Sequence, residues 1–165
     1  MNWEAFGAIG EIVGAIAVVA SLIYLASQMR ISNRESQQAA MREVSQSGLT
    51  FLGRIGSDVA TASVWLRGLT QNEALTAEES MQFTALCTEL TDIWERAHYL
   101  RKLSEFEPHL IQSMESNLHR IAGSPGFRSW FKGRSSSYSD EFVQMVQVCI
   151  NDSDNYEPWR ATNKD

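Results

Sequence analysis

The chain has 165 residues, the length of one domain, with 14 Lys and Arg against 20 Asp and Glu and a formal net charge of −6. The acidic balance excludes a broad basic nucleic-acid surface, and two cysteines exclude a disulfide scaffold. The charges are unevenly distributed: residues 1–29 contain only Glu4 and Glu11, whereas the other 32 charged residues, including every Lys and Arg, follow residue 29. We therefore expect two differently built parts and not one homogeneous soluble domain.

Residues 5–27 form an apolar segment that contains a single charge, Glu11. As a helix, the segment is long enough to cross roughly 30 Å of hydrocarbon. Arg30 and Arg34 follow it directly, whereas only Glu4 precedes it. The positive-inside rule then places the N-terminus outside and the C-terminal region in the cytoplasm. A cleaved signal peptide fits poorly, because the start is acidic and no small-residue cleavage site follows.

One side of the predicted spanning helix is small and polar, and the other is a lipid-facing set of large apolar residues. We call the first side the small-polar stripe; on a helical wheel it consists of Glu4, Gly7, Gly10, Glu11, Gly14, Val18, Ser21, Leu25 and Gln28. Gly10 and Gly14 form a GxxxG pair, a spacing that lets helices approach closely in lipid. A carboxylate at the depth of Glu11 is costly and is usually paired or functional. No second apolar segment offers it a partner, so we expect self-association or association with another membrane protein.

Two interpretations of the small-polar stripe stay open. In the first, helices pack at the glycines, and Glu11 is protonated or reaches toward the interface. In the second, several copies form a ring whose lumen carries Glu4 and Glu11, because rings of carboxylates favour cations, with a hydrophobic constriction at Val18 and Leu25. The sequence therefore predicts a homo-oligomeric single-span membrane protein that forms a cation-conducting pore. The alternative is a membrane-anchored helical interaction module without transport activity, which binds another protein.

The pattern of residues 30–150 predicts a cytoplasmic helical domain. Apolar residues at spacings of three and four predict helices over residues 31–55, 58–69, 76–100 and 108–121, a short helix from Ser124 and a last helix capped by Ser139. Thr76 and Glu79 have the spacing of a capping box. A serine-rich loop is expected over 133–139 and a mobile tail over 151–165.

No run of residues alternates between apolar and polar side chains as a strand does. The predicted fold class is therefore all-α: a single N-terminal transmembrane helix over residues 1–29, followed by a cytoplasmic helical bundle over residues 30–150, in a chain that self-associates through the spanning helix. Membrane lipid and further copies of the chain are the expected partners, and nucleic acid is not expected.

Two blocks of the sequence, the apolar run from Trp3 to Ala26 and the run Ser124–Phe131 with Asp140–Phe142 after it, resemble a known group. This is an uncharacterised family of small bacterial membrane proteins with one N-terminal transmembrane helix and a helical cytoplasmic remainder. The resemblance implies a bacterial source and the inner membrane, and it implies no activity, cofactor or site.

Metal ligands are the first chemistry to consider in the helical part. Glu95 and His98 have the Glu-x-x-His spacing of a di-metal carboxylate site. Such a site needs a second motif of the same spacing, and Glu115 and His119 are one residue too far apart. We expect these four residues to be polar surface or core-edge side chains, with no metal and no cofactor.

The remaining reactive side chains also indicate structural roles. Cys87 and Cys149 lie on apolar helix faces and lack CxxC spacing, so we expect buried free thiols. No nucleophile signature or phosphate-binding loop is present, so we expect no catalytic residue and no enzyme. Arg128, Lys132 and Arg134 form a small basic cluster, for which we expect a solvated helix face, with anionic headgroups or a partner as the alternative.

Overall fold

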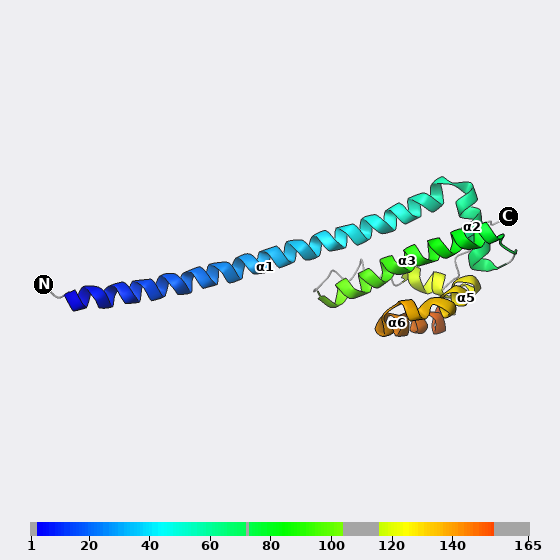
Figure 1. Cartoon of the computed structure of the whole chain (residues 1–165). Coiled ribbons are helices and arrows are strands. Elements are labelled where there is room, and N and C mark those ends of the chain that lie inside the picture. The colour runs from blue at the N-terminus through cyan, green and yellow to red at the C-terminus, as the bar shows by residue number, and fades with distance from the viewer. Residues whose placement is uncertain (1–2, 72, 104–115, 154–165) are drawn as a thin grey trace. The chain divides into compact units, whose positions relative to one another are not determined.

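In a computed structural model of the chain, the described residues are 3–71, 73–103 and 116–153 (Figure 1). These residues form helices and no β-strand, which confirms the all-α fold class. The elements are α1 (Trp3–Ser57), α2 (Val59–Thr70), α3 (Ala77–Leu103), a helical stretch over residues 116–122, α5 (Pro125–Arg134), the 3₁₀ helix η1 (Ser135–Ser137) and α6 (Asp140–Asn151). The chain divides into two compact units, Met1–Ala40 and Met41–Asp165.

The first unit consists of helix α1 as far as Ala40. No proline interrupts the helix, and every side chain from Glu11 to Ser36 is exposed. The exposed residues include large apolar ones: Ile12, Ile16 and Ile23 leave between 61% and 66% of their surface uncovered. In length and composition, α1 is the one described helix that could span a membrane, and none of its apolar window is buried by the chain.

The second unit has its core between the last turns of α1 and the helices that follow. In α1, Val44, Phe51 and Ile55 are buried at spacings of seven and four, as expected for one helix face. Phe51 meets Trp65 of α2 edge to face, with ring centroids 5.6 Å apart, and Trp65 in turn contacts Phe83 of α3 at 5.8 Å. The predicted apolar face of α3 is therefore a core face.

Capping side chains fix where the middle helices begin. Asp58 caps α2 by accepting hydrogen bonds from the backbone N–H groups of Ala60 (3.2 Å) and Thr61 (2.9 Å). The predicted capping box at the start of α3 is confirmed: the Thr76 N–H donates to Glu79 Oε2 (2.9 Å), and the Glu79 N–H donates to Thr76 Oγ1 (3.2 Å). Polar side chains close in sequence therefore satisfy the backbone donors left free at both helix starts.

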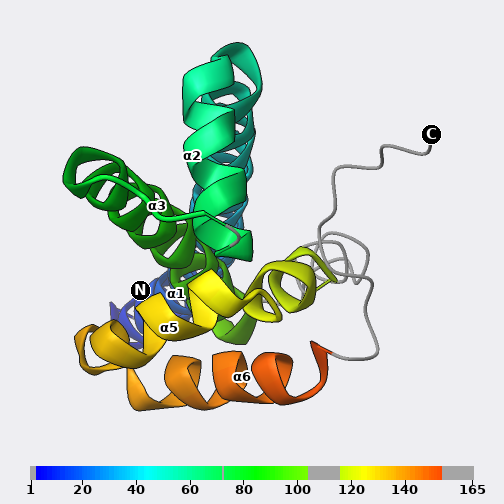
Figure 2. The ribbon, with the colours of Figure 1, turned by 90° about the vertical axis from the view of Figure 1, so that its right-hand side faces the viewer.

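Helices α5 and α6 run beside one another, as Figure 2 shows. Phe127 and Phe131 of α5 are stacked at 5.7 Å, and Phe131 also stacks on Tyr138 at 5.9 Å. Tyr138 then contacts Phe142 of α6 at 5.8 Å. This row of aromatic rings fills the space between the two helices, and both Phe127 and Phe142 are fully buried.

Three expectations for the C-terminal half need correction or fall outside the described residues. The loop predicted over 133–139 is wrong in its first part, because Gly133 and Arg134 end α5 and the serines form η1. Ser139 does occupy the N-cap position of α6, but its side chain does not cap that helix. Most of the helix expected over 108–121, and the tail beyond Ser153, lie outside the described residues; residues 116–122 are helical.

Candidate functional site

The structure places all nine residues of the small-polar stripe on helix α1. Seven residues make nearly two helical turns, so Glu11, Val18 and Leu25 lie one above another along one side. From Gly10 onward every stripe residue is exposed, and the side chain of Glu4 lies outside the described set. A Cβ atom added at Gly7, Gly10 or Gly14 would meet no atom within 4 Å, so no described part of the chain packs against these glycines.

Two polar residues of the stripe form hydrogen bonds within their own helix. The Ser21 hydroxyl donates to the carbonyl of Ala17 at 2.8 Å, and the Gln28 amide donates to the Tyr24 hydroxyl at 2.8 Å. Neither Ser21 nor Gln28 therefore needs a hydrogen-bond partner on a second helix. Glu11 differs, because no described residue forms a hydrogen bond or ion pair with its carboxylate. Among the stripe residues whose side chains are described, Glu11 is the one that most needs a polar partner outside the chain.

The Glu-x-x-His pair of α3 anchors the start of α6. Glu95 Oε1 accepts hydrogen bonds from both the backbone N–H and the hydroxyl of Ser139, each at 2.8 Å. His98 Nε2 is buried and lies 3.5 Å from Glu141 Oε1, at ion-pair distance but without hydrogen-bond geometry. The hydrogen bond from Lys102 to Glu141 lowers the pKa of that carboxyl group. Glu95 and His98 therefore both contact the start of α6, where their role is structural.

A second histidine faces α6 at its other end. His119 Nε2 lies 3.7 Å from Asp152 Oδ2, just after the last turn of α6. Glu115, which precedes His119 by four residues, lies outside the described residues. Among the described residues, no group of three His, Cys, Asp or Glu side chains is placed to hold a metal ion.

The two cysteines are buried free thiols, as the sequence predicts. Cys87 is completely covered, and this burial raises the pKa of its thiol. Cys149 lies 3.9 Å from the sulfur of Met145 on the buried face of α6. A raised thiol pKa disfavours the nucleophilic thiolate, so neither the position nor the environment of Cys87 suits catalysis.

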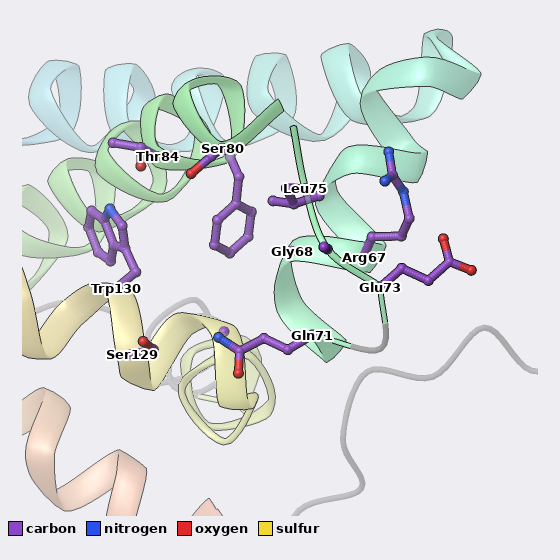
Figure 3. Close-up of a pocket in the computed structure, with 12 residues that line it drawn as sticks. Arg67, Gly68, Gln71, Glu73, Leu75, Ser80, Thr84, Ser129 and Trp130 are labelled. Atoms are coloured by element: carbon purple, nitrogen blue, oxygen red, sulfur yellow. The ribbon is translucent and has the colours of Figure 1, made fainter. Parts of the chain in front are cut away.

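An open pocket of about 510 Å³ lies between α2, α3 and α5 (Figure 3). Its walls include Leu75, Ser80 and Trp130. The guanidinium of Arg67 at the rim is already held by the carboxylate of Glu79, which raises the pKa of the arginine. The indole N–H of Trp130 has no partner among the described residues, but the nitrogen is covered and not accessible from the pocket. The lining also includes the exposed polar residues Gln71, Glu73, Ser80 and Ser129.

Sequence reasoning did not identify the contact that closes one end of this pocket. A Cβ atom at Gly126 would lie 1.7 Å from the carbonyl oxygen of Gly68, and one at Gly68 would lie 2.2 Å from the ring of Phe83. Helices α2 and α5 therefore cross with their backbones in contact. Two isolated glycines in different helices give no signal in a single sequence that they meet.

Comparison with protein-family models, with curated proteins and with solved structures finds no match to this chain.

Proposed function

We propose that this chain is a membrane protein anchored by α1, which self-associates through the small-polar stripe to form a cation-conducting pore. One observation carries the proposal: the apolar window of α1 is wholly exposed, and Glu11 within it has no partner in the described part of the chain. Exposed apolar helices need lipid or another protein, because water disfavours such a surface. Lipid can cover the large apolar face, whereas a carboxylate in hydrocarbon needs a polar neighbour.

A second copy of the chain supplies that neighbour in the simplest arrangement. Gly7, Gly10 and Gly14 leave open space on the same side as Glu11, so a second helix can approach closely there. When several copies form a ring, Glu11 faces a central axis where water and cations stabilise the carboxylates. Val18 and Leu25 lie further along the same side and form the narrow apolar part of that path.

The Glu11→Gln variant tests the pore directly. The full chain, reconstituted into planar bilayers, should conduct cations, and Glu11→Gln should lower the selectivity for cations over anions. Glu73→Gln is the matched control, because Glu73 is an exposed carboxylate of the second unit. It should leave conductance and selectivity unchanged. An absence of conductance in the wild-type chain under voltage, tension and ligand trials would contradict the pore.

A second candidate function is an anchored interaction module in the bacterial inner membrane, with the helical unit in the cytoplasm. Leu49 and Leu52 favour it, because both are more than 60% exposed on the part of α1 whose other face is buried in the second unit. In this case crosslinking in cells should capture one consistent protein partner. Glu11→Gln should then alter assembly while no conductance is measured for either chain.

A further inference from the structure

We propose that the open pocket between α2, α3 and α5 binds a small organic cation, a molecule with an apolar ring and one amino group (Figure 3). Its volume of about 510 Å³ lies within the range of known small-molecule sites, which is roughly 300–1,000 Å³. All of its lining residues belong to the second unit. The pocket is therefore separate from the small-polar stripe of α1.

The apolar part of the lining offers surface for a ring. Phe83 is 7% exposed, and Leu75 and Trp130 are half-buried. The indole nitrogen of Trp130 is covered, so the accessible part of this side chain is carbon and offers no hydrogen bond. Aromatic side chains of this kind bind the apolar rings of ligands by stacking or edge contacts.

The charges around the pocket favour a cation over an anion. Arg67 donates to both carboxylate oxygens of Glu79, one of them at 3.1 Å, so its charge is already neutralised. Glu73 also lines the pocket; its side chain is exposed, and no described residue forms an ion pair or hydrogen bond with it. From residue 68 to residue 95 the sequence contains six Asp and Glu and no Lys or Arg. An anion would therefore meet a free carboxylate and no free cation among the described lining residues.

The C-terminal end of α2 adds to this preference. Gly68 and Gln71 line the pocket at the last turn of this helix, where the helix dipole carries partial negative charge. Gln71 has a left-handed backbone with φ 53°, the one such non-glycine residue among those described, and its N–H donates to the carbonyl of Arg67 at 2.8 Å. This turn leads the chain from α2 to Glu73 and Leu75. The same turn therefore brings the helix end and the free carboxylate to one pocket.

The arrangement of the lining fits a ligand with two different ends. Figure 3 shows Trp130 and Glu73 at opposite sides of the pocket, so a ring can lie against Trp130 while an ammonium group lies toward Glu73. Neutral polar side chains complete the lining, and none of them forms a side-chain hydrogen bond with a described residue: Gln71, Ser80, Thr84 and Ser129. Their oxygens can accept hydrogen bonds from an ammonium group.

Isothermal titration calorimetry on the full chain in phosphatidylcholine nanodiscs tests the charge preference. Three probes share an indole ring: tryptamine carries an ammonium group, tryptophol a hydroxyl, and indole-3-propionic acid a carboxylate. We expect saturable binding of tryptamine, about fivefold weaker binding of tryptophol, and no saturable binding of the acid. Titrations into empty nanodiscs give the heat of partition into lipid, which is subtracted. The affinity for tryptamine should fall at high salt.

Matched variants identify the residues responsible. Glu73→Gln should weaken tryptamine binding by about fivefold and leave tryptophol binding unchanged. Glu73→Asp keeps the charge and should bind tryptamine more tightly than Glu73→Gln does. Glu43→Gln removes an exposed carboxylate that does not line this pocket and should bind like the wild type. Ser80→Trp and Ser129→Trp enlarge exposed lining side chains on α3 and α5, and each should weaken tryptamine binding by about tenfold or more.

Four outcomes would overturn the proposal: no saturable heat with tryptamine, equal affinity for tryptamine and tryptophol, unchanged tryptamine binding in both tryptophan variants, or saturation by a lysine-rich peptide at lower concentration than by tryptamine. None of these readouts depends on conductance or on the number of copies in the assembly. The ligand site can therefore fail while the pore holds, and it can hold when the pore fails.

Discussion

Gly126 shows how strictly a single residue can be determined by its neighbours. The carbonyl of Gly68 lies where its Cβ atom would be, so α2 and α5 must separate to admit even one methyl group. Overpacking a filled interior generally destabilises a protein by about 1–3 kcal/mol. Only glycine fits at position 126, because the atoms that a side chain would meet belong to the rigid backbone of α2.

We therefore expect Gly126→Ala to destabilise the second unit by about 1–3 kcal/mol, measured by chemical denaturation of the full chain in detergent. Gly133→Ala is the control, because that residue lies in the same helix and an added Cβ meets nothing within 4 Å. The control should be neutral or slightly stabilising, since alanine favours helix more than glycine does. Equal stability of the two variants would contradict the close contact between α2 and α5.

The buried thiols make a second prediction about individual residues. Cys87 is fully covered, burial raises its thiol pKa, and Cys149 is only 3% exposed. A polar thiol reagent at neutral pH should therefore modify neither residue in the folded chain and both after denaturation. Rapid modification of one thiol under native conditions would show that the core around it opens readily.

Among the elements, the start of α3 depends on one carboxylate with two roles. Glu79 completes the capping box with Thr76 and also binds Arg67 of α2. The hydrogen bond from Arg67, followed by that from the Thr76 N–H, lowers the pKa of Glu79 from its ordinary 4.5. A carboxyl group with a lowered pKa in the folded state contributes stability that is present above its unfolded pKa. That contribution is lost as the pH falls through the folded-state pKa.

The free energy of unfolding should therefore lose this contribution below about pH 4.5. Glu79→Gln should be less stable than the wild type at neutral pH, and the difference should shrink in acid, because the variant has no carboxylate to protonate. Denaturant titrations of both chains over this pH range provide the measurement. A difference that stays constant with pH would show that the charge of Glu79 does not support the junction of α2 and α3.

Helix α6 is held at its start by a residue of another helix. Ser139 donates from both its backbone and its side chain to Glu95. Glu95→Ala removes the carboxylate oxygen that accepts both bonds and should cost about 1–2 kcal/mol, with faster amide exchange in the first turn of α6. Arg96→Ala is the neighbouring control and should leave exchange in α6 unchanged. Unaltered exchange in Glu95→Ala would mean that the apolar face of α6 alone holds the helix.

Over the whole molecule, periodic features were predictable from the sequence and contacts between distant residues were not. The apolar run, the capping box and the apolar face of α3 are local patterns whose physical cause lies within one helix, and the helices predicted from these three patterns are confirmed. The hydrogen bonds that Ser139 donates to Glu95 span 44 residues, and the contact of Gly68 with Gly126 joins two separate helices. A single sequence contains no signal for such pairings.

For the small-polar stripe, the sequence could predict which residues share one face of a helix, and nothing more about the site. The spacing of Glu11, Val18 and Leu25 follows from helical geometry, and the structure shows these three side chains exposed, with no described residue bound to the Glu11 carboxylate. What covers it depends on molecules outside the chain. Lipid insertion, the number of copies and the path of an ion are properties of an assembly, which helical periodicity in one sequence does not encode.

The mass of the protein–detergent particle tests the central proposal most directly. Light scattering with separate detection of protein and detergent gives the number of chains per particle. Self-association through the small-polar stripe predicts one defined multiple of the chain mass, and Gly10→Leu with Gly14→Leu should reduce it by blocking close helix approach. A single-chain mass for the wild-type protein, in detergent and in nanodiscs assembled with excess chain, would contradict the proposal.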